Sequence, residues 1–276
     1  MTTPKKSDAV YVAGDSDRER KRLQEQSNLF NPSTIHLFER AGIVPGMRVL
    51  DVGSGAGDVA LLLADIVGKD GAVVGVDTNS AILETAQGRV AAAGYSNVSF
   101  IAGDIRNVAL EGQFDAMVGR LVLMYLAHPV EAIQRSMKLL RPGGIVAFQE
   151  FDATTCFISA PHTSICDKLK YWIVETFRHA GMELQMGFKL RNTFTSAGLP
   201  APQMHLDAII GGGENWAGYA YAVNTVRSIL PYIEKFGVAT REEVDIDTLT
   251  DRFRNEIVSQ NGVVMISTWV SAWTQV

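Results

Sequence analysis

The chain has 276 residues, of which 47% are hydrophobic and 20% are charged, which suffices for one large domain with a substantial core. Its formal net charge of −5 argues against a nucleic-acid-binding protein, because such proteins present a basic face to the phosphates. Cys156 and Cys166 have neither a CxxC pair nor a histidine cluster beside them, so we expect no disulfide framework and no metal site. The N-terminus lacks the apolar run of a signal peptide, and no stretch reaches the roughly 18 apolar residues that span a bilayer, so we expect a cytoplasmic protein without a membrane partner.

The first 42 residues are polar and predict two helices. Ser16 and Glu19 have the spacing of a capping box, which predicts a helix that begins after Ser16. Asn31-Pro32 suits the N-cap and first turn of a second helix that ends near Gly42. Pro45-Gly46 then interrupts the chain before the pattern changes.

Short apolar, β-branched runs alternate with amphipathic helical patterns between residues 48 and 151. Runs of this kind are typical of parallel strands that are buried on both faces. They occupy residues 49–52, 72–76, 98–102, 114–118 and 145–149. The alternation predicts a doubly wound α/β sheet.

The pattern loosens after residue 151. Residues 204–210 alternate, with Met204, Leu206 and Ile210 on one face, which suits a sixth strand and places His205 on the opposite face, where we expect a surface histidine. A β-rich run closes the chain over residues 262–273. The helical stretches at about 160–198 and 214–258 are interpreted as insertions that cover a site.

A glycine-rich loop follows the first predicted strand and opens the first helix of the sheet. It reads Asp51-Val52-Gly53-Ser54-Gly55-Ala56-Gly57-Asp58, and glycines in such a loop let the backbone approach a ligand closely. A dinucleotide fingerprint would read G-x-G-x-x-G, whereas Asp58 stands where that pattern has its last glycine. Asp51 also argues against a dinucleotide, because a carboxylate there opposes a pyrophosphate and suits a ligand with an ammonium group.

Acidic residues stand at the ends of the next two predicted strands. Asp77, followed by Thr78, ends the second strand, where a carboxylate can accept both ribose hydroxyls of an adenosine. Asp104 and Ile105 follow the third strand and can offer an adenine a carboxylate partner and an apolar neighbour. The fifth strand is preceded by Leu140-Arg141-Pro142-Gly143-Gly144. NAD enzymes share the acidic end of the second strand, so that feature alone does not exclude them.

Together these motifs resemble the class I S-adenosylmethionine-dependent methyltransferases, especially the small-molecule branch of ubiquinone- and menaquinone-biosynthesis-type enzymes. The resemblance covers roughly residues 43–155. It implies a Rossmann-like α/β fold with a seven-stranded doubly wound sheet in the order 3-2-1-4-5-7-6, of which residues 269–273 are the last strand. It also implies that residues 1–42 form an N-terminal helical lid, loosely matched at Tyr11 and Arg22-Leu23, and that residues 43–276 form the methyltransferase domain.

The resemblance further implies which residues bind S-adenosylmethionine. Gly53 and Gly55 would lie against the methionine moiety, and Arg120, after the fourth strand, would border the same end. Asp77 would hold the ribose hydroxyls, while Asp104 and Ile105 would flank the adenine. The full set of expected cofactor-binding residues is Asp51, Gly53, Ser54, Gly55, Asp77, Thr78, Asp104, Ile105 and Arg120.

The methyl acceptor is narrowed by the motifs that the sequence lacks. After the fourth strand the chain reads Gly119-Arg120-Leu121-Val122 instead of the Asn-Pro-Pro-Tyr loop of base and glutamine N-methyltransferases. Neither the glutamate pair of arginine methyltransferases nor the carboxylate-rich metal site of catechol enzymes is recognisable. A small apolar or aromatic metabolite remains as the expected partner, and a homodimer stays open as the assembly.

Ligands of open α/β sheets bind at the carboxyl ends of the strands, which makes Glu150, Tyr125 and His128 the candidate catalytic residues. Glu150 would otherwise pair with Arg120 or with a loop amide, because an unpaired buried carboxylate is unfavourable. Tyr125 would otherwise pack, and His128 would help to begin a helix at Pro129. A C-methyltransferase acting on a quinone precursor or isoprenoid, and a non-catalytic protein that binds S-adenosylmethionine, stay open as alternatives.

Overall fold

The computed structural model of the chain describes residues 7–10 and 17–276, with side chains in the first helix described from Leu29 onward. Ser16 of the expected capping box and Tyr11 of the expected lid lie outside the described residues, as do the side chains of Arg22 and Leu23. The chain forms two compact units. We call residues 30–150, 186–205 and 270–276 the sheet unit, and residues 151–185 and 206–269, with the described residues up to Leu29, the helical unit.

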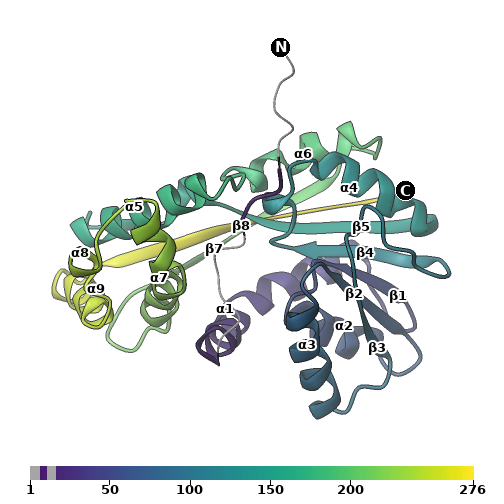
Figure 1. Ribbon diagram of the computed structural model, residues 1–276, viewed down its shortest axis with the longest axis horizontal. Helices are drawn as coiled ribbons and strands as arrows, with labels where there is room; N and C mark the ends of the chain where they lie inside the picture. The colour runs from purple at the N-terminus through teal and green to yellow at the C-terminus, as the bar shows by residue number, and fades with distance from the viewer. Residues whose placement is uncertain (1–6, 11–16) are drawn as a thin grey trace. The chain divides into compact units, whose positions relative to one another are not determined.

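Parallel strands form the centre of the sheet unit (Figure 1). They are β1 (Arg48–Val52), β2 (Ala72–Asp77), β3 (Val98–Ala102), β4 (Phe114–Arg120) and β5 (Leu140–Asp152). The helices between these strands are α2 (Asp58–Val67), α3 (Ser80–Ala92) and α4 (Pro129–Ser136), and α6 (Met186–Ser196) precedes β7. Short 3-10 turns lie at Leu123–Tyr125 (η1) and Met137–Leu139 (η2). The predicted alternation of strand and helix is therefore confirmed.

The predicted strand order is confirmed, with one addition. The sheet runs β3-β2-β1-β4-β5-β8-β6, and β7 also pairs with β8. The strand expected at 204–210 is β7 (Gln203–Gly211), and the last strand is β8 (Val263–Gln275). The additional strand is β6 (Ile158–Ala160), which pairs antiparallel with the start of β8 and gives the sheet eight strands.

One long helix replaces the two that were predicted at the N-terminus. Helix α1 runs without a break from Asp17 to Ala41, with Pro32 inside it. An internal proline removes one backbone donor and disfavours a continuous helix. Phe30, before the proline, and Leu37 and Phe38, after it, are all buried in the sheet unit. We attribute the unbroken helix to this burial, which local turn signals cannot reveal.

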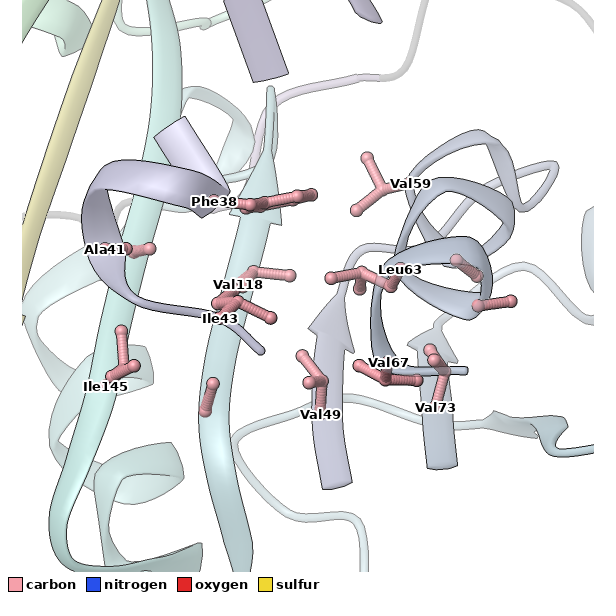
Figure 2. Close-up of a cluster of buried hydrophobic side chains, with 14 of the residues drawn as sticks. Phe38, Ala41, Ile43, Val49, Val59, Leu63, Val67, Val73, Val118 and Ile145 are labelled. Carbon is pink, nitrogen blue, oxygen red and sulfur yellow. The ribbon is translucent and has the colours of Figure 1, made fainter. Parts of the chain in front are cut away.

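The main core of the sheet unit lies between the central strands, including β1, β2, β4 and β5, and the helices α1, α2 and α3. Figure 2 shows the Phe38 ring extending from α1 past the end of β4 toward Val59, Ile43 beside Val118, and Leu63 and Val67 of α2 facing the neighbouring strands. These side chains are almost completely buried. This apolar layer holds the start of α2, and therefore the glycine loop before it, at the carboxyl ends of the strands.

The helical unit contains α5 (Ser164–His179), α7 (Gly218–Lys235), α8 (Arg241–Val244) and α9 (Leu249–Ser259), with a short 3-10 turn, η3, at Ala153–Thr155. Helices are thus present in both stretches interpreted as insertions. The first stretch is divided, however, because α5 belongs to the helical unit and α6 to the sheet unit. No helix in the described part of the chain is long and apolar enough to cross a membrane.

The sequence-based orientation of β7 is wrong. Its apolar face is exposed, with 46% of Leu206 and 60% of Ile210 accessible. His205 is half-buried instead, and its ring lies edge-to-face with that of His36, with 5.0 Å between centroids. Alternation shows that the two faces of a strand differ, but which face is covered depends on the neighbouring elements.

Candidate cofactor site at the carboxyl ends of the strands

The glycine loop turns sharply between β1 and α2. Gly53, Gly55 and Gly57 all have positive φ angles, of 70°, 50° and 86°, a region that residues with a Cβ rarely adopt. The loop is tied to β2, because the amides of Gly53 and Ser54 donate to the carbonyl of Val76 at 2.8 and 3.1 Å. A Cβ built on Gly55 would meet nothing within 4 Å, so the loop leaves open space at its tip.

Val122, in the turn after β4, closes the loop from the other side. A Cβ on Gly53 would lie 2.5 Å from Cγ2 of Val122, so only glycine fits at this position. A side chain on Gly119 would meet both Phe148 and Val122. The ends of β1, β4 and β5 are therefore packed closely around the loop.

Asp51 lies just before the loop and is almost fully buried, with 1% of its surface exposed. Neither carboxylate oxygen has a hydrogen-bond partner among the described residues, and the same holds for Oγ of Ser54. Burial raises the pKa of Asp51 to about 7, against the opposing effect of the positive charge of Arg120. Buried polar groups without partners are unfavourable, and such groups beside a glycine loop fit a ligand with a positive group.

Arg120 ends β4 on the same face of the sheet as Asp51. Asp51 pairs in register with Val118, and Arg120 lies two residues further along that strand. Nη1 of Arg120 donates to Oδ1 of Asn31 at 3.2 Å and to Oγ1 of Thr34 at 3.1 Å, both in α1. A carboxyl and a guanidinium thus project from the same face of neighbouring strands, a pair of groups that suits the ammonium and carboxylate of an amino acid.

Asp77 ends β2 and holds the loop through backbone amides. Oδ2 accepts from the amide of Gly55 and Oδ1 from the amide of Asn79, each at 2.9 Å. The adjacent Thr78 is exposed. Each Asp77 oxygen keeps a second lone pair, so the carboxylate can still accept from two hydroxyls.

Asp104 has an intramolecular partner that the sequence analysis missed. Nε of Arg106 lies 2.9 and 3.0 Å from the two Asp104 oxygens, and this pairing lowers the pKa of Asp104. The neighbouring Ile105 is buried. An aspartate two residues before an arginine in a turn is the signal that could have revealed the pair.

Glu150, near the end of β5, is completely buried. Oε1 accepts from the amides of Val122 and Leu123 at 3.0 and 2.7 Å, whereas Oε2 has no partner in the described chain. Burial raises the pKa of Glu150 to about 8, although these amides oppose the shift. Of the two structural partners expected for Glu150, Arg120 and a loop amide, the structure shows the loop amides. Arg120 pairs in register with Gln149, so Glu150 points to the opposite face of the sheet from Arg120.

The two other catalytic candidates follow in the same segment. Tyr125 ends the turn η1 and is half-buried. His128 is exposed and occupies the N-cap position of α4, where its side chain makes no capping hydrogen bond within the described residues. The structure thus brings Glu150 together with the turn that begins at Val122, and it leaves His128 at the surface.

Comparisons with known proteins show the family of the chain. Residues 43–198, more than half of the chain, match the model of the family described as "Methyltransferase domain". A ubiquinone/menaquinone biosynthesis C-methyltransferase UbiE of Ectopseudomonas mendocina is 33% identical over 116 residues, which are 41% of this chain and 45% of that protein. The UbiE protein of Pseudomonas paraeruginosa is 32% identical over 133 residues, or 48% and 49% of the two chains. The chain therefore spans about half the length of the curated relatives it matches.

Solved structures share the fold. A putative methyltransferase from Bacillus halodurans superposes with a TM-score of 0.57 at 16% identity, covering 87% of this chain and 97% of the other. An N-methyltransferase of Haemonchus contortus, solved with phosphomonomethylethanolamine and S-adenosylhomocysteine, superposes with a TM-score of 0.53 at 16% identity, covering 87% and 52%. The chain belongs to the methyltransferase-domain family, which confirms the expected class, an S-adenosylmethionine-dependent methyltransferase.

Proposed function

We propose that this protein transfers the methyl group of S-adenosylmethionine to a small neutral metabolite, apolar or aromatic, that carries an ionisable hydroxyl. The observation that carries the proposal is the carboxyl of Glu150. It is buried, its Oε1 is fixed by two amides, and its Oε2 has no partner among residues that the structure describes. With a pKa near 8, the group can accept a proton from a hydroxyl of similar acidity.

The position of Glu150 relative to the glycine loop supports this role. The amide of Val122 donates a hydrogen bond to Glu150, and the Val122 side chain packs against Gly53. A single residue, Val122, thus contacts both the Glu150 carboxyl and the loop expected to hold the methyl donor. When bound, S-adenosylmethionine supplies an electrophilic methyl group on a sulfonium, and in-line transfer needs the nucleophile nearby.

For the cofactor, we propose an orientation in which its amino-acid end lies at β1 and β4. Asp51 would take the ammonium, because its buried oxygens lack partners in the described chain, and Arg120 would take the carboxylate. Asp77 would bind the ribose hydroxyls, and Asp104 and Ile105 would flank the adenine. Gly53, Ser54, Gly55 and Thr78 would complete the contacts.

A C-methyltransferase of a quinone precursor or isoprenoid is the second candidate. The curated relatives named above are C-methyltransferases of ubiquinone and menaquinone biosynthesis. A phenol that loses its proton to Glu150 becomes nucleophilic at both oxygen and ring carbon, so the same carboxyl serves O- and C-methylation.

We also propose that residues 1–42 form a lid and that the helical insertions cover the site. The proposed partner is a small molecule, and the proposed assembly is a homodimer.

The proposal is tested by transfer of tritiated methyl from S-adenosylmethionine into a panel of phenols, quinols, isoprenoids and primary amines. We expect label in hydroxyl-bearing rings and a turnover about 100-fold lower for Glu150→Gln, since Gln keeps the acceptor for both amides but cannot take a proton. Affinity for S-adenosylhomocysteine should be retained. Glu131→Gln, at an exposed ion pair on α4, is the matched control. Full turnover of Glu150→Gln, or label only in amines, would contradict the role of Glu150, and no transfer to any acceptor would favour a non-catalytic binding protein.

A further inference from the structure

A network of buried and partly buried hydrogen bonds joins α1 to the end of the sheet. Gln149 of β5 is completely buried, and its Nε2 donates to Oγ of Ser33 at 2.9 Å and to Oγ of Ser271 at 3.0 Å. Its Oε1 lies 2.7 Å from Oγ1 of Thr34, which is also buried. Oγ1 of Thr34 is in turn 3.1 Å from Nη1 of Arg120. All these residues belong to the sheet unit.

The hydrogen bonds of this network all have the same direction, from Arg120 through Thr34 to Gln149 and the two serines. Both hydrogens of the Gln149 amide have serine oxygens as acceptors, so Oε1 faces Thr34 and must accept. The Thr34 hydroxyl has one hydrogen, and Gln149 at 2.7 Å is nearer than the carbonyl of Phe30 at 3.2 Å. The lone pairs of Thr34 are then available to the guanidinium of Arg120, which can only donate.

This arrangement explains why the Asp51 carboxyl has no hydrogen-bond partner within the described chain. Asp51 and Arg120 lie on the same face of neighbouring strands, and the positive charge of Arg120 acts on the Asp51 carboxyl. Nevertheless both oxygens of Asp51 lack a hydrogen-bond partner in the part of the chain that the structure describes. Arg120 directs Nη1 to Thr34 and Asn31 instead. A guanidinium paired with Asp51 would occupy the oxygens that we assign to the ammonium of the cofactor.

We propose that Thr34 is a positioning residue that holds the Arg120 guanidinium away from Asp51 and aims it at the carboxylate of the bound amino-acid moiety. Gln149 sets the direction of the Thr34 hydroxyl and so belongs to the same hydrogen-bond network. The inference rests on the assignment of Arg120 and Asp51 to the amino-acid end of the cofactor under Proposed function. It assigns a positioning role to a residue of α1, outside the glycine loop.

The test compares two ligands by calorimetry, S-adenosylhomocysteine, which carries the amino acid, and 5′-methylthioadenosine, which lacks it. In Thr34→Val we expect affinity for S-adenosylhomocysteine to fall about 10-fold, the scale of one hydrogen bond to a charged group, and affinity for 5′-methylthioadenosine to stay within about 2-fold. Thr34→Ser keeps the hydroxyl and should restore the wild-type ratio. In an Arg120→Met background, Thr34→Val should have no further effect on either ligand.

Equal weakening of both ligands by Thr34→Val, or no weakening, would overturn the inference. If Thr34→Val does not fold, Gln149→Met tests the same network, because it removes the acceptor that orients the Thr34 hydroxyl, and the same ligand-selective loss is expected. Wild-type protein that binds the two ligands equally would instead overturn the assignment of Arg120 and Asp51. The two failures are therefore distinguishable.

Discussion

Val122 lies directly over Gly53, where a Cβ would approach Cγ2 of Val122 to 2.5 Å. The amide of the same valine donates to Oε1 of Glu150 at 3.0 Å. One residue after β4 therefore fixes the distance between the glycine loop and the buried carboxyl. This relationship supports our proposal that the methyl donor and the proton acceptor share one site.

The first prediction concerns Gly53→Ala. The new methyl group would collide with Val122 and would require a φ of 70°, so we expect a loss of roughly 2–4 kcal/mol in the free energy of unfolding. Gly46→Ala is the matched control, since Gly46 has a φ of 86° but open space around it, and should lose only about 1 kcal/mol. Urea unfolding of both variants measures the difference. Equal losses would mean that Val122 moves aside easily.

The affinity for the cofactor should depend on pH through Asp51. The folded pKa of about 7 means that much of this carboxyl is protonated at neutral pH, and a bound ammonium favours the carboxylate. Binding then releases a proton, so affinity for S-adenosylhomocysteine should rise by up to about 10-fold per pH unit below pH 7 and level off above it. Titration calorimetry between about pH 5.5 and 8 measures this slope. Asp51→Asn should abolish it, and 5′-methylthioadenosine should not show it; a slope in either case would refute the assignment.

Two raised pKa values predict a falling stability of the ligand-free protein as the pH rises. Asp51 shifts from 3.8 to about 7 and Glu150 from 4.5 to about 8, so between these values the folded state binds more protons than the unfolded state. The contribution of these two carboxyls to the free energy of unfolding is complete below about pH 4. It is lost as the pH rises through their pKa values in the folded state, by up to about 1.4 kcal/mol per pH unit for each group.

Urea unfolding at about pH 5 and pH 8 tests this dependence by comparing the wild type with the Asp51→Asn, Glu150→Gln double variant. The variant should gain stability relative to the wild type at the higher pH, because other titrating groups cancel in the comparison. A constant difference would show that these carboxyls ionise normally.

Arg89 fastens α3 to the glycine loop. Nη2 pairs with Asp58 at 2.7 Å and Nη1 donates to the carbonyl of Ala56 at 2.7 Å, with Asp58 only 9% exposed. Arg89→Met should therefore lower the free energy of unfolding by about 1–3 kcal/mol. Arg135→Met breaks an exposed pair with Glu131 on α4 and should change it by less than about 0.5 kcal/mol. Thermal unfolding of the two variants provides the measurement, and similar shifts would refute a special role for Arg89.

Local pattern was sufficient for the framework of the fold. The β-branched runs at 49–52 and 114–118 became β1 and β4, because strands buried on both faces need continuous apolar residues. The glycine loop was equally readable, since positive φ angles at Gly53, Gly55 and Gly57 favour residues without a Cβ.

Contacts between distant residues could not be predicted in this way. Local turn signals at Asn31-Pro32 predicted a helix start, yet the burial of Phe30 and Phe38 keeps α1 continuous. The apolar alternation of β7 did not reveal that Leu206 faces outward and His205 inward. Both errors arose because pattern describes an element alone, whereas its neighbours decide which side is covered.

By itself, the sequence determined the α/β class and the position of the glycine loop, because each depends on residues that are close together in the chain. The strand order and the family followed from the resemblance of its motifs to those of a known family. Only the tertiary structure decided the state of the side chains in the site. It joined Thr34 to Gln149 across 115 residues, left Asp51 without a partner in the described chain, and gave Glu150 two amides from the turn after β4. The pKa and the hydrogen-bonding capacity of a buried group depend on what surrounds it in space, and that is set by the fold.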